Sequence, residues 1–364
     1  MAGEYFGMEI FGIIMAGGDG TRFWPLSRKK KPKQLLNLSG NDVMINEAID
    51  RLSNITDRNN IFVVTNKLQA PAVADVTENH LAVDHIIIEP EGRNTAACIG
   101  YAAVEIIKKY GDGIMVITPS DHYIKNIREF TRILKLAVSV ADGTERLVTI
   151  GIKPTYPATG FGYIEYGRGD EEFKDVLSFK EKPDEETAKE YVDSGRYVWN
   201  SGMFIWKAST VLKCFKEFVP DIYSSLIEIE DSINTDEEGN SINRIYPTIR
   251  KISIDYAVME PAAARGEVVV IPGDFGWNDI GSFDMLNVIF EPDENGNIRI
   301  GKTVAVDTTN TYIYASSRVV TALGVDDLII VETPDAVMVC RKEDSQSVRK
   351  IVESVLNHGY SELL

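Results

Sequence analysis

IFGIIMAGGDGTRFWPLSRKKKPKQ is the sequence of residues 10–34, in which a short apolar run passes into a glycine-rich segment. The apolar run is too short for a typical helix and is typical of a buried strand in a parallel sheet. Gly17, Gly18 and Gly20 can adopt positive φ and let backbone N–H groups approach an anion closely. Cationic side chains follow at once, namely Arg22, Arg28, Lys29, Lys30, Lys31 and Lys33. A strand, a glycine loop and a cationic cluster in this order predict a polyphosphate-binding loop.

The spacing within this loop excludes two common phosphate-binding motifs. No lysine follows the last glycine directly, as it does in a Walker loop, and GGDG is not GxGxxG. A glycine loop alone can be an ordinary turn, and Lys29–Lys31 can be a solvated charge run. Lys33 differs from these lysines because Pro32 fixes the backbone angle just before it.

Composition indicates an ordinary soluble globular chain. The 364 residues are 44% hydrophobic and 26% charged, with room for one large domain and a small one. No segment approaches the roughly 20 apolar residues of a membrane span, and the N-terminus lacks the features of a signal peptide. Cys98, Cys214 and Cys340 have no metal-binding spacing. We therefore expect reduced core cysteines in a cytoplasmic protein.

The net charge gives a further restriction on function. A formal charge of −17 argues against a nonspecific nucleic-acid-binding protein, which presents an extended basic face. The cationic cluster after the glycine loop runs against this acidic background. It therefore indicates a site for a small polyanion.

Helical and strand patterns alternate from residue 43 to residue 152. We expect helices over 43–52, 68–79, 95–109 and 127–141, and strands over 61–65, 85–89, 114–118 and 147–152. This βαβ alternation predicts an α/β fold in which a mostly parallel sheet is covered by helices on both faces. Ligands bind at the carboxyl ends of the strands in such sheets, so the residues that follow each strand are candidates for function.

Polar side chains follow two of these strands. Asn94 and Thr95 come after the strand at 85–89, where they could simply cap the next helix. Asp121 comes after the strand at 114–118 and suits a magnesium ion, although it could also be a helix N-cap. We interpret His122 as a supporting or structural residue.

The pattern changes after residue 152 to turns and longer strands. Glu181 and Lys182 are adjacent, and such a pair alone is usually a solvated surface feature. Asn200 interrupts an apolar strand, and a buried amide there needs partners that sugar hydroxyls would provide. Asp279 lies in a glycine-flanked turn before a predicted helix, where capping is again the simpler interpretation.

The last part of the chain predicts a small second domain. Residues 221–250 are acidic and polar, and we expect two helices there joined by an exposed turn. Short strands follow from about residue 291, at 303–306, 311–314, 319–322, 328–331 and 337–340, with a final helix over 343–356. The expected domains are therefore 1–290 and 291–364.

Four blocks occur along the chain in a fixed order: GGxGTRxxPLSx closing with PKQ, then TGFGYIE, EKP and WNSGMF. Together they resemble the signature of the sugar-nucleotide pyrophosphorylases, and within them the mannose-1-phosphate guanylyltransferases. The resemblance implies a Rossmann-like nucleotide-diphospho-sugar transferase fold, followed by a short left-handed β-helix and a terminal helix. The chain stops without the cupin-like domain of longer relatives, so phosphomannose isomerase activity is not expected.

The resemblance also implies roles for single residues. It makes Arg22, Lys33 and Lys182 catalytic. It implies that the nucleotide is bound by Ala16, Gly17, Gly18, Asp19, Gly20, Thr21, Arg22, Lys33, Asn94, Thr95, Ala96 and Asp121. The sugar phosphate would be bound by Gly162, Glu165, Glu181, Lys182 and Asn200, and the metal by Asp121 and Asp279.

The implied reaction is attack of mannose 1-phosphate on the α-phosphorus of GTP, with Mg²⁺, to give GDP-mannose and pyrophosphate. A phosphate monoester is already nucleophilic, so catalysis needs positioning and charge neutralisation rather than a protein nucleophile. One alternative is a nucleotidyltransferase for another base or hexose 1-phosphate. Another is a noncatalytic sugar-nucleotide sensor, which would be expected to lack a metal carboxylate or phosphate lysine. A homodimer is implied by the resemblance alone.

Overall fold

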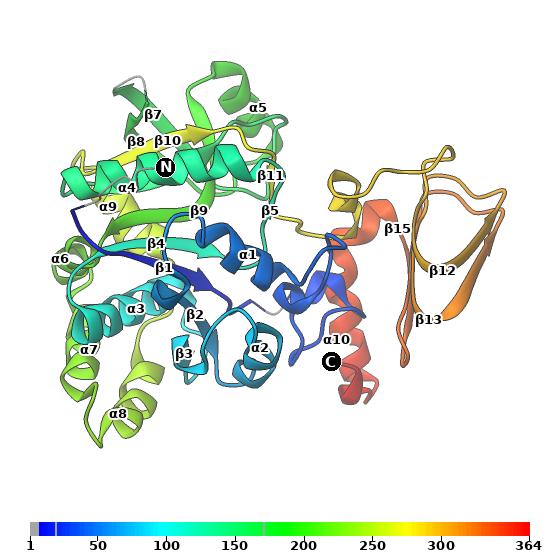
Figure 1. Cartoon of the computed structure of the whole chain (residues 1–364). Helices are drawn as coiled ribbons and strands as arrows, with labels where there is room; N and C mark the ends of the chain where they lie inside the picture. Colours follow the sequence, from blue (N-terminus) through cyan, green and yellow to red (C-terminus); the bar gives the residue numbers. More distant parts are fainter. Residues whose placement is uncertain (1–6, 19, 170–171) are drawn as a thin grey trace.

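A computed structural model describes residues 7–18, 20–169 and 172–364. Its largest element is a nine-stranded sheet in the order β3-β2-β1-β4-β9-β6-β10-β8-β7 (Figure 1). The strands are β1 (Ile10–Met15), β2 (Ile61–Asn66), β3 (Ile86–Glu89), β4 (Ile114–Pro119), β6 (Leu147–Ile152), β7 (Tyr163–Gly169), β8 (Lys174–Lys180), β9 (Tyr197–Lys207) and β10 (Val268–Gly273).

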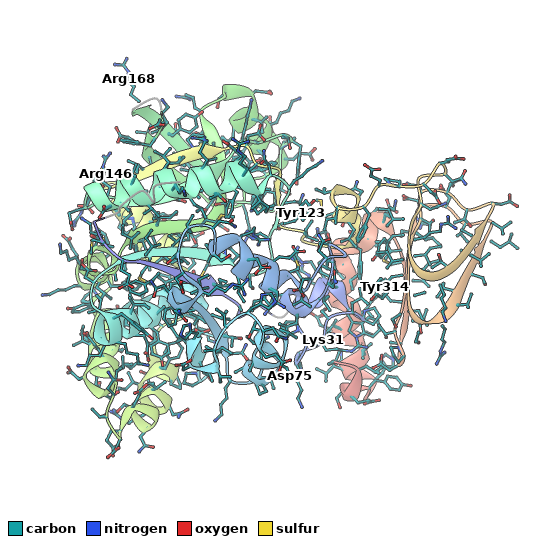
Figure 2. All side chains as sticks on the ribbon, in the orientation of Figure 1. Lys31, Asp75, Tyr123, Arg146, Arg168 and Tyr314 are labelled. Carbon is teal, nitrogen blue, oxygen red and sulfur yellow. The ribbon has the colours of Figure 1, made fainter. Side chains whose placement is uncertain are left out.

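Helices cover both faces of this sheet, as the alternating pattern predicts. Phe11 and Ile13 of β1 pack in one core with α3, α6 and α7, whereas Ile10 and Ile14 pack in a second core with α1 and α4. Side chains fill the space between the sheet and its helices (Figure 2). The helices are α1 (Met44–Leu52), α2 (Ala70–Thr77), α3 (Asn94–Tyr110), α4 (Ile127–Gly143), α5 (Glu185–Ser194), α6 (Ala208–Phe218), α7 (Pro220–Ser232), α8 (Glu238–Ile245) and α9 (Glu260–Ala263).

The strand order of the sheet reverses at β1, because β2 and β3 lie on one side of it and β4 lies on the other. β1 pairs in parallel with β2 on one side and with β4 on the other, and a reversal of this kind opens a crevice at the carboxyl ends of the strands. β9 is antiparallel to β4 and β6, between which it lies, and it also pairs with β7. Sequence patterns do not predict this placement. Within the described ranges, no helix is both long and apolar enough to cross a membrane.

The C-terminal part forms a separate four-stranded sheet in the order β12-β13-β14-β15. β12 (Ile298–Val306), β13 (Tyr312–Leu323) and β14 (Leu328–Glu332) are parallel, and β15 (Val337–Arg341) returns antiparallel. The strands expected at 311–314 and 319–322 are one continuous strand. The expected final helix over 343–356 is 3₁₀ at first (Lys342–Val348) and becomes α10 at Arg349–Asn357.

A third apolar core joins this C-terminal part to the segment after the glycine loop. Phe23 and Trp24 belong to the same buried cluster as Phe283 and Tyr312. The Trp24 indole Nε1 also donates a hydrogen bond to the Leu363 carbonyl at 2.9 Å. Figure 1 shows α10 beside the segment that follows β1. The loop is thus held from both the sheet and the end of the chain.

Candidate active site

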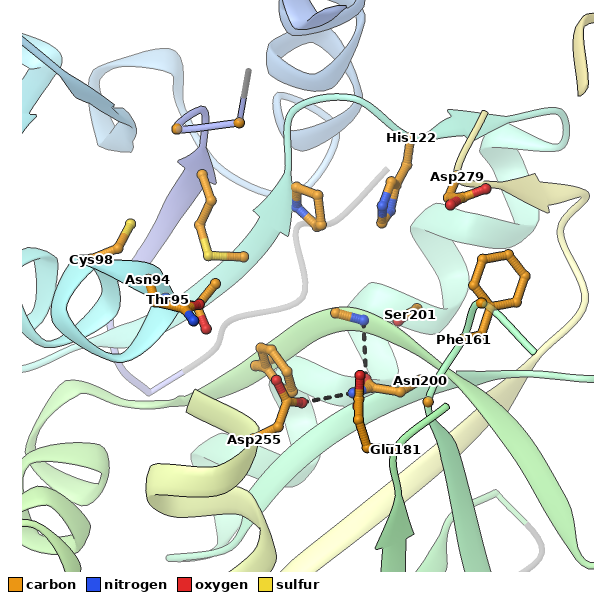
Figure 3. A pocket seen from close by; sticks show the side chains of 18 of the residues that line it. Asn94, Thr95, Cys98, His122, Phe161, Glu181, Asn200, Ser201, Asp255 and Asp279 are labelled. Atoms are coloured by element: carbon orange, nitrogen blue, oxygen red, sulfur yellow. Dashed lines mark hydrogen bonds between the residues drawn. The ribbon is translucent and has the colours of Figure 1, made fainter. Parts of the chain in front are cut away.

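A cavity of about 490 Å³ lies at the carboxyl ends of β1, β3 and β4, lined there by Met15, Glu89 and Pro119. Figure 3 shows three groups of side chains around it. One group comes from the start of α3, a second contains His122 and Asp279, and a third contains Asn200, Glu181 and Asp255, as Figure 3 also shows. The cavity therefore joins the glycine loop to the blocks that follow residue 152.

The glycine loop forms one edge of this cavity through Gly17 and Gly18. Gly20 has a φ of +60°, and a Cβ at this position would lie 2.5 Å from the Lys33 Cβ. Only glycine combines this backbone angle with such a close approach. The loop and Lys33 are therefore packed against each other directly.

The Gln34 side chain binds the backbone of the glycine loop. Its buried side-chain amide donates to the Ala16 carbonyl at 3.0 Å and to the Gly18 carbonyl at 3.3 Å. These bonds leave the loop's N–H groups, rather than its carbonyls, free to face an anion. Sequence analysis gave Gln34 no role, although it closes the PKQ block.

The Lys33 ammonium lies between the two aspartates that were predicted to bind metal. It donates to the Asp121 carboxylate at 2.9 Å, to the Asp121 carbonyl at 2.8 Å and to the Asp279 carbonyl at 2.5 Å. Burial raises the pKa of Asp121, but attraction to Lys33 outweighs it and holds this pKa below its usual value. The fold thus brings together three residues that are far apart in sequence.

The electrostatics of the aspartate pair suit a divalent cation. Burial raises the pKa of Asp279, and repulsion from the Asp121 carboxylate raises it further, while Lys33 and Arg22 act in the opposite direction. Mg²⁺ is commonly held by one or two carboxylates and phosphate oxygens, so the pair fits it. Among the described residues, no group of three or more His, Cys, Asp or Glu side chains is arranged for a metal.

The other predicted cations divide into three kinds. The exposed Arg22 donates from Nη1 to the Gln346 Oε1 at 2.8 Å, and Arg28 forms an ion pair with Asp335 at 2.8 Å. Lys29–Lys31 are exposed, as a charge run would be. Asp19 lies outside the described residues. Seven other residues predicted to bind the nucleotide are not among the described residues that line the cavity, namely Ala16, Gly20, Thr21, Arg22, Lys33, Ala96 and Asp121.

Asn94 and Thr95 line the cavity at the start of α3. The N-cap position is Arg93, which makes no capping hydrogen bond with its side chain, and Asn94 has a φ of +67°. The Thr95 Oγ1 instead accepts a hydrogen bond from the Ile254 N–H at 2.9 Å. The Asn94 Oδ1 accepts a hydrogen bond from the Thr95 N–H at 2.8 Å, so Asn94 does satisfy one backbone N–H at the start of the helix. Capping does not account for Thr95, whose side chain is directed to the segment at 252–255.

Four of the five residues predicted for the sugar phosphate line the same cavity: Gly162, Glu181, Lys182 and Asn200. The Glu181 carboxylate and the Lys182 ammonium form an ion pair at 3.0 Å. Glu165, the fifth, lies on β7, accepts a hydrogen bond from the Ser178 Oγ at 3.0 Å, and is not among the described lining residues. Its predicted role in sugar binding remains a prediction.

Comparison with known proteins agrees with this geometry. The family model of the nucleotidyl transferases matches residues 11–295, and that of the mannose-phosphate isomerase/GMP-like β-helix domain matches residues 301–355. The chain belongs to the nucleotidyl transferase family. The short β-helix that the sequence predicts is thus confirmed, as is the resemblance from which it was inferred.

Named relatives of this nucleotidyl transferase are similar over most of the chain. Mannose-1-phosphate guanylyltransferase 2 of Escherichia coli O157:H7 is 38% identical over 94% of this chain and 73% of its own length. The xanthan biosynthesis protein XanB of Xanthomonas campestris is 37% identical over 97% of this chain and 75% of its own. A solved structure from Thermus thermophilus, described as a mannose-1-phosphate geranyltransferase, has a TM-score of 0.85 at 30% identity and covers 96% of this chain and 99% of its own.

Two side chains of this candidate site, the buried Glu89 and the half-buried His122, favour their neutral forms. Burial raises the pKa of Glu89 to about 7, although a hydrogen bond from the Tyr246 hydroxyl opposes the shift. Burial lowers the pKa of His122 to about 4, and its Nδ1 accepts a hydrogen bond from the Trp277 indole at 3.1 Å. His122 is therefore neutral and held in place, in agreement with a supporting role.

Sequence analysis assigned no role to Glu89 or to Asp255. Glu89 is the last residue of β3, and its carboxylate lies 3.6 Å from where a Cβ on Gly17 would stand. Its position at a strand end could have indicated a functional role, because ligands bind at this edge of the sheet. Asp255 lines the cavity and accepts a hydrogen bond from Asn200 at 2.7 Å, a contact between residues that only the fold brings together.

Proposed function

We propose that this chain makes GDP-mannose and pyrophosphate from GTP and mannose 1-phosphate. The observation that supports this most is the buried Lys33 ammonium, which contacts both Asp121 and Asp279. Asp279 lines the cavity that the glycine loop shares with the sugar-side residues. The relatives named mannose-1-phosphate guanylyltransferase cover almost the whole chain and favour the same reaction.

In the proposed step, a phosphate oxygen of mannose 1-phosphate forms a bond to the α-phosphorus of GTP. The bond from that phosphorus to the oxygen shared with the β-phosphorus breaks, and its electron pair leaves with pyrophosphate. No proton has to move, because the attacking phosphate is ionised and pyrophosphate leaves as an anion. Catalysis then consists of holding two anions in line and neutralising their charge.

The roles on the nucleotide side follow from the contacts of each residue. The N–H groups of Gly17 and Gly18 would bind the triphosphate, since Gln34 already occupies the carbonyls of this loop. Lys33 would neutralise charge at the α-phosphate. Arg22, which Gln346 orients from the C-terminal part, would contact the outer phosphates. Asn94 and Thr95 would lie against the base and ribose.

Asp121 and Asp279 would hold the Mg²⁺ ion, a role that is supported by their mutual repulsion and by their common neighbour Lys33. When bound, Mg²⁺ supplies additional positive charge to the phosphate oxygens. Lys33 then has a second role, which is to orient the Asp121 carboxylate through its 2.9 Å contact.

On the sugar side, Glu181 and Asn200 would accept and donate hydrogen bonds to hexose hydroxyls, with Lys182 at the phosphate. Gly162 supports this arrangement because a Cβ there would lie 3.1 Å from the Glu181 carboxylate and 3.6 Å from the Asn200 Cβ. A side chain at this position would intrude between the two groups. Glu165 would act from the outer edge of β7.

A pyrophosphate-release assay tests this proposal with the four common nucleoside triphosphates crossed against several hexose 1-phosphates. We expect the highest kcat/KM for GTP with mannose 1-phosphate, and dependence on added Mg²⁺. A different preferred pair would indicate a nucleotidyltransferase for another base or hexose. Release from no pair would favour a sensor, although Lys33, Asp121 and Asp279 are all present and argue against one.

Three broader expectations also stand as proposals. The domain boundary lies near residue 290 in our proposal. We also propose that the protein is located in the cytoplasm, which its three free cysteines support. We also propose a homodimer. Exposed apolar side chains on neighbouring strands of the β-helix support it, with Val306 at 49% and Leu323 at 72% exposure in directly paired positions of β12 and β13.

A further inference from the structure

Asp255 lies where the sugar end of the cavity meets the start of a π-helix, η6 (Asp255–Met259). Helical turns of this type often occur at functional sites because they turn a side chain away from its regular direction. Figure 3 shows the side chains of Asp255 and Asn200 pointing towards each other in the lining of the cavity, with Glu181 beside them. Sequence analysis gave this segment no role, but Asp255 is one of the lining residues.

We propose that Asp255 determines which hexose is accepted, by fixing the Asn200 amide and accepting a hydrogen bond from one hydroxyl of the sugar. This proposal rests on the proposed function, since it assumes that a hexose 1-phosphate occupies this end of the cavity. It adds to that function a residue for which no role was predicted.

The first support is the way in which Asn200 is held. Its Nδ2 donates to the Asp255 Oδ1 at 2.7 Å, and its Oδ1 accepts the Gly202 N–H at 3.1 Å. An amide beside a carboxylate must present its NH₂ group to it, so Asp255 prevents the amide from flipping. Asn200 therefore presents its remaining donor and acceptor to the cavity in one fixed order.

The second support is that Asp255 is anchored to the nucleotide side. The Ile254 N–H donates to the Thr95 Oγ1 at 2.9 Å, and the Ala96 N–H donates to the Ile252 carbonyl at 3.2 Å. These bonds fix the segment that precedes Asp255 against the first turn of α3. The distance between the proposed base site and the sugar-binding carboxylate is thus set by the fold.

The third support is charge. Burial raises the pKa of Asp255 and the neighbouring Glu181 raises it further, whereas the hydrogen bond from Asn200 lowers it. Two carboxyl groups, those of Asp255 and Glu181, therefore line this part of the cavity. Neutral hydroxyl groups are suitable partners, because a carboxylate accepts several hydrogen bonds and those to a charged acceptor are strong. The hexose ring would therefore face Asp255, with its phosphate turned towards Lys182 and the proposed Mg²⁺ ligands.

Isothermal titration calorimetry with mannose 1-phosphate tests the proposal in the full-length chain. Asp255→Asn keeps an oxygen for Asn200 but removes the charge, and we expect affinity to fall about tenfold to a hundredfold. Asp255→Ala should weaken binding at least as much. Asp327→Asn is the matched control, because Asp327 accepts a hydrogen bond from the Asn310 amide at the same 2.7 Å in the C-terminal sheet. Its affinity should stay within about twofold of the wild type.

Monodeoxy analogues of mannose 1-phosphate distinguish a sugar contact from a general structural role. We expect removal of one particular hydroxyl to weaken binding to the wild type but to change binding to Asp255→Asn very little. The loss of affinity from removing this hydroxyl and the loss from substituting Asp255 would then not be additive. Unchanged affinity of Asp255→Asn, or equal losses for every analogue in both proteins, would overturn the proposal.

Turnover of the wild type keeps this inference separate from the proposed function. Binding without turnover would contradict the proposed reaction, while the deoxy series would still decide the role of Asp255. If the wild type does not bind mannose 1-phosphate at all, both proposals are overturned.

Discussion

At the scale of single residues, Lys33 carries a charge that is almost completely buried. Its ammonium makes three contacts within 2.9 Å although its side chain is only 5% exposed. Such a buried cation is stable only because the Asp121 carboxylate compensates it. The sequence identified Lys33 through Pro32, but the contact with Asp121 depends on the fold.

Lys33→Ala should reduce kcat by about a hundredfold to a thousandfold, because a preorganised charge at the transferred phosphate is lost. Pyrophosphate release at saturating substrates measures the effect. Lys31→Ala is the matched control, since Lys31 is exposed in the same segment, and its turnover should be unchanged. Near-normal turnover of Lys33→Ala would remove this residue from the mechanism.

Glu89 should make folding stability depend on pH. Its pKa is about 7 in the folded chain against 4.5 in the unfolded one, so the folded state holds the proton more tightly between these values. This group's contribution to stability is therefore fully present below about pH 4.5 and is lost as the pH rises through 7, at most about 3 kcal/mol.

Glu89→Gln tests this sign, because a neutral amide cannot titrate. Denaturant unfolding at pH 5 and pH 8 should show a smaller loss of stability for the variant than for the wild type. Equal losses in the two proteins would show that Glu89 does not titrate in this range.

At the scale of elements, the glycine loop depends on one backbone angle. Gly20 has a φ of +60° and leaves no room for a Cβ beside Lys33. Gly20→Ala should therefore destabilise the fold by more than about 1 kcal/mol and also reduce turnover, because it displaces Lys33. Thermal unfolding and pyrophosphate release measure the two effects.

Gly195 provides the control for this substitution. It has a similar φ of +64° at the end of α5, but a Cβ added there would have no atom within 4 Å. Gly195→Ala should cost only the backbone strain of about 1 kcal/mol and leave turnover unchanged. Loss of turnover in Gly195→Ala equal to that in Gly20→Ala would refute the role of the close contact with Lys33.

Local pattern and chain order account for what could be predicted at this scale. The strand at Leu147–Ile152 has the predicted bounds, and the helix predicted over 95–109 spans Asn94–Tyr110, since the apolar periodicity specifies both. The insertion of β9 between β4 and β6 was not predictable, because it depends on pairing between distant strands. The contacts of Asp255 with Asn200 and of Thr95 with Ile254 were missed for the same reason.

At the scale of the whole molecule, the C-terminal part contacts the site through Gln346. This side chain accepts from Arg22 at 2.8 Å and donates to the Ser282 Oγ at 2.6 Å. Gln346→Ala should raise the KM for GTP several-fold while kcat changes little, because Arg22 is left unoriented at the outer phosphates. An unchanged KM would place Arg22 outside the nucleotide site.

The proposed dimer can be tested by substitutions on the β-helix surface of the full-length chain. Leu323→Lys combined with Val306→Lys places charge on the paired exposed positions of β12 and β13. Sedimentation equilibrium should show a dimer for the wild type and a monomer for the double variant. A dimer that survives both substitutions must use another face.

The central claim is that a phosphate oxygen of mannose 1-phosphate attacks the α-phosphorus of GTP, and an isotope experiment followed by ³¹P NMR tests it most directly. Mannose 1-phosphate labelled with ¹⁸O on its phosphate is incubated with GTP, Mg²⁺ and the wild-type chain. Direct attack at the α-phosphorus predicts equal amounts of GDP-mannose and pyrophosphate, with all of the label in GDP-mannose and none in pyrophosphate. Label in pyrophosphate, or no GDP-mannose at all, would contradict the account.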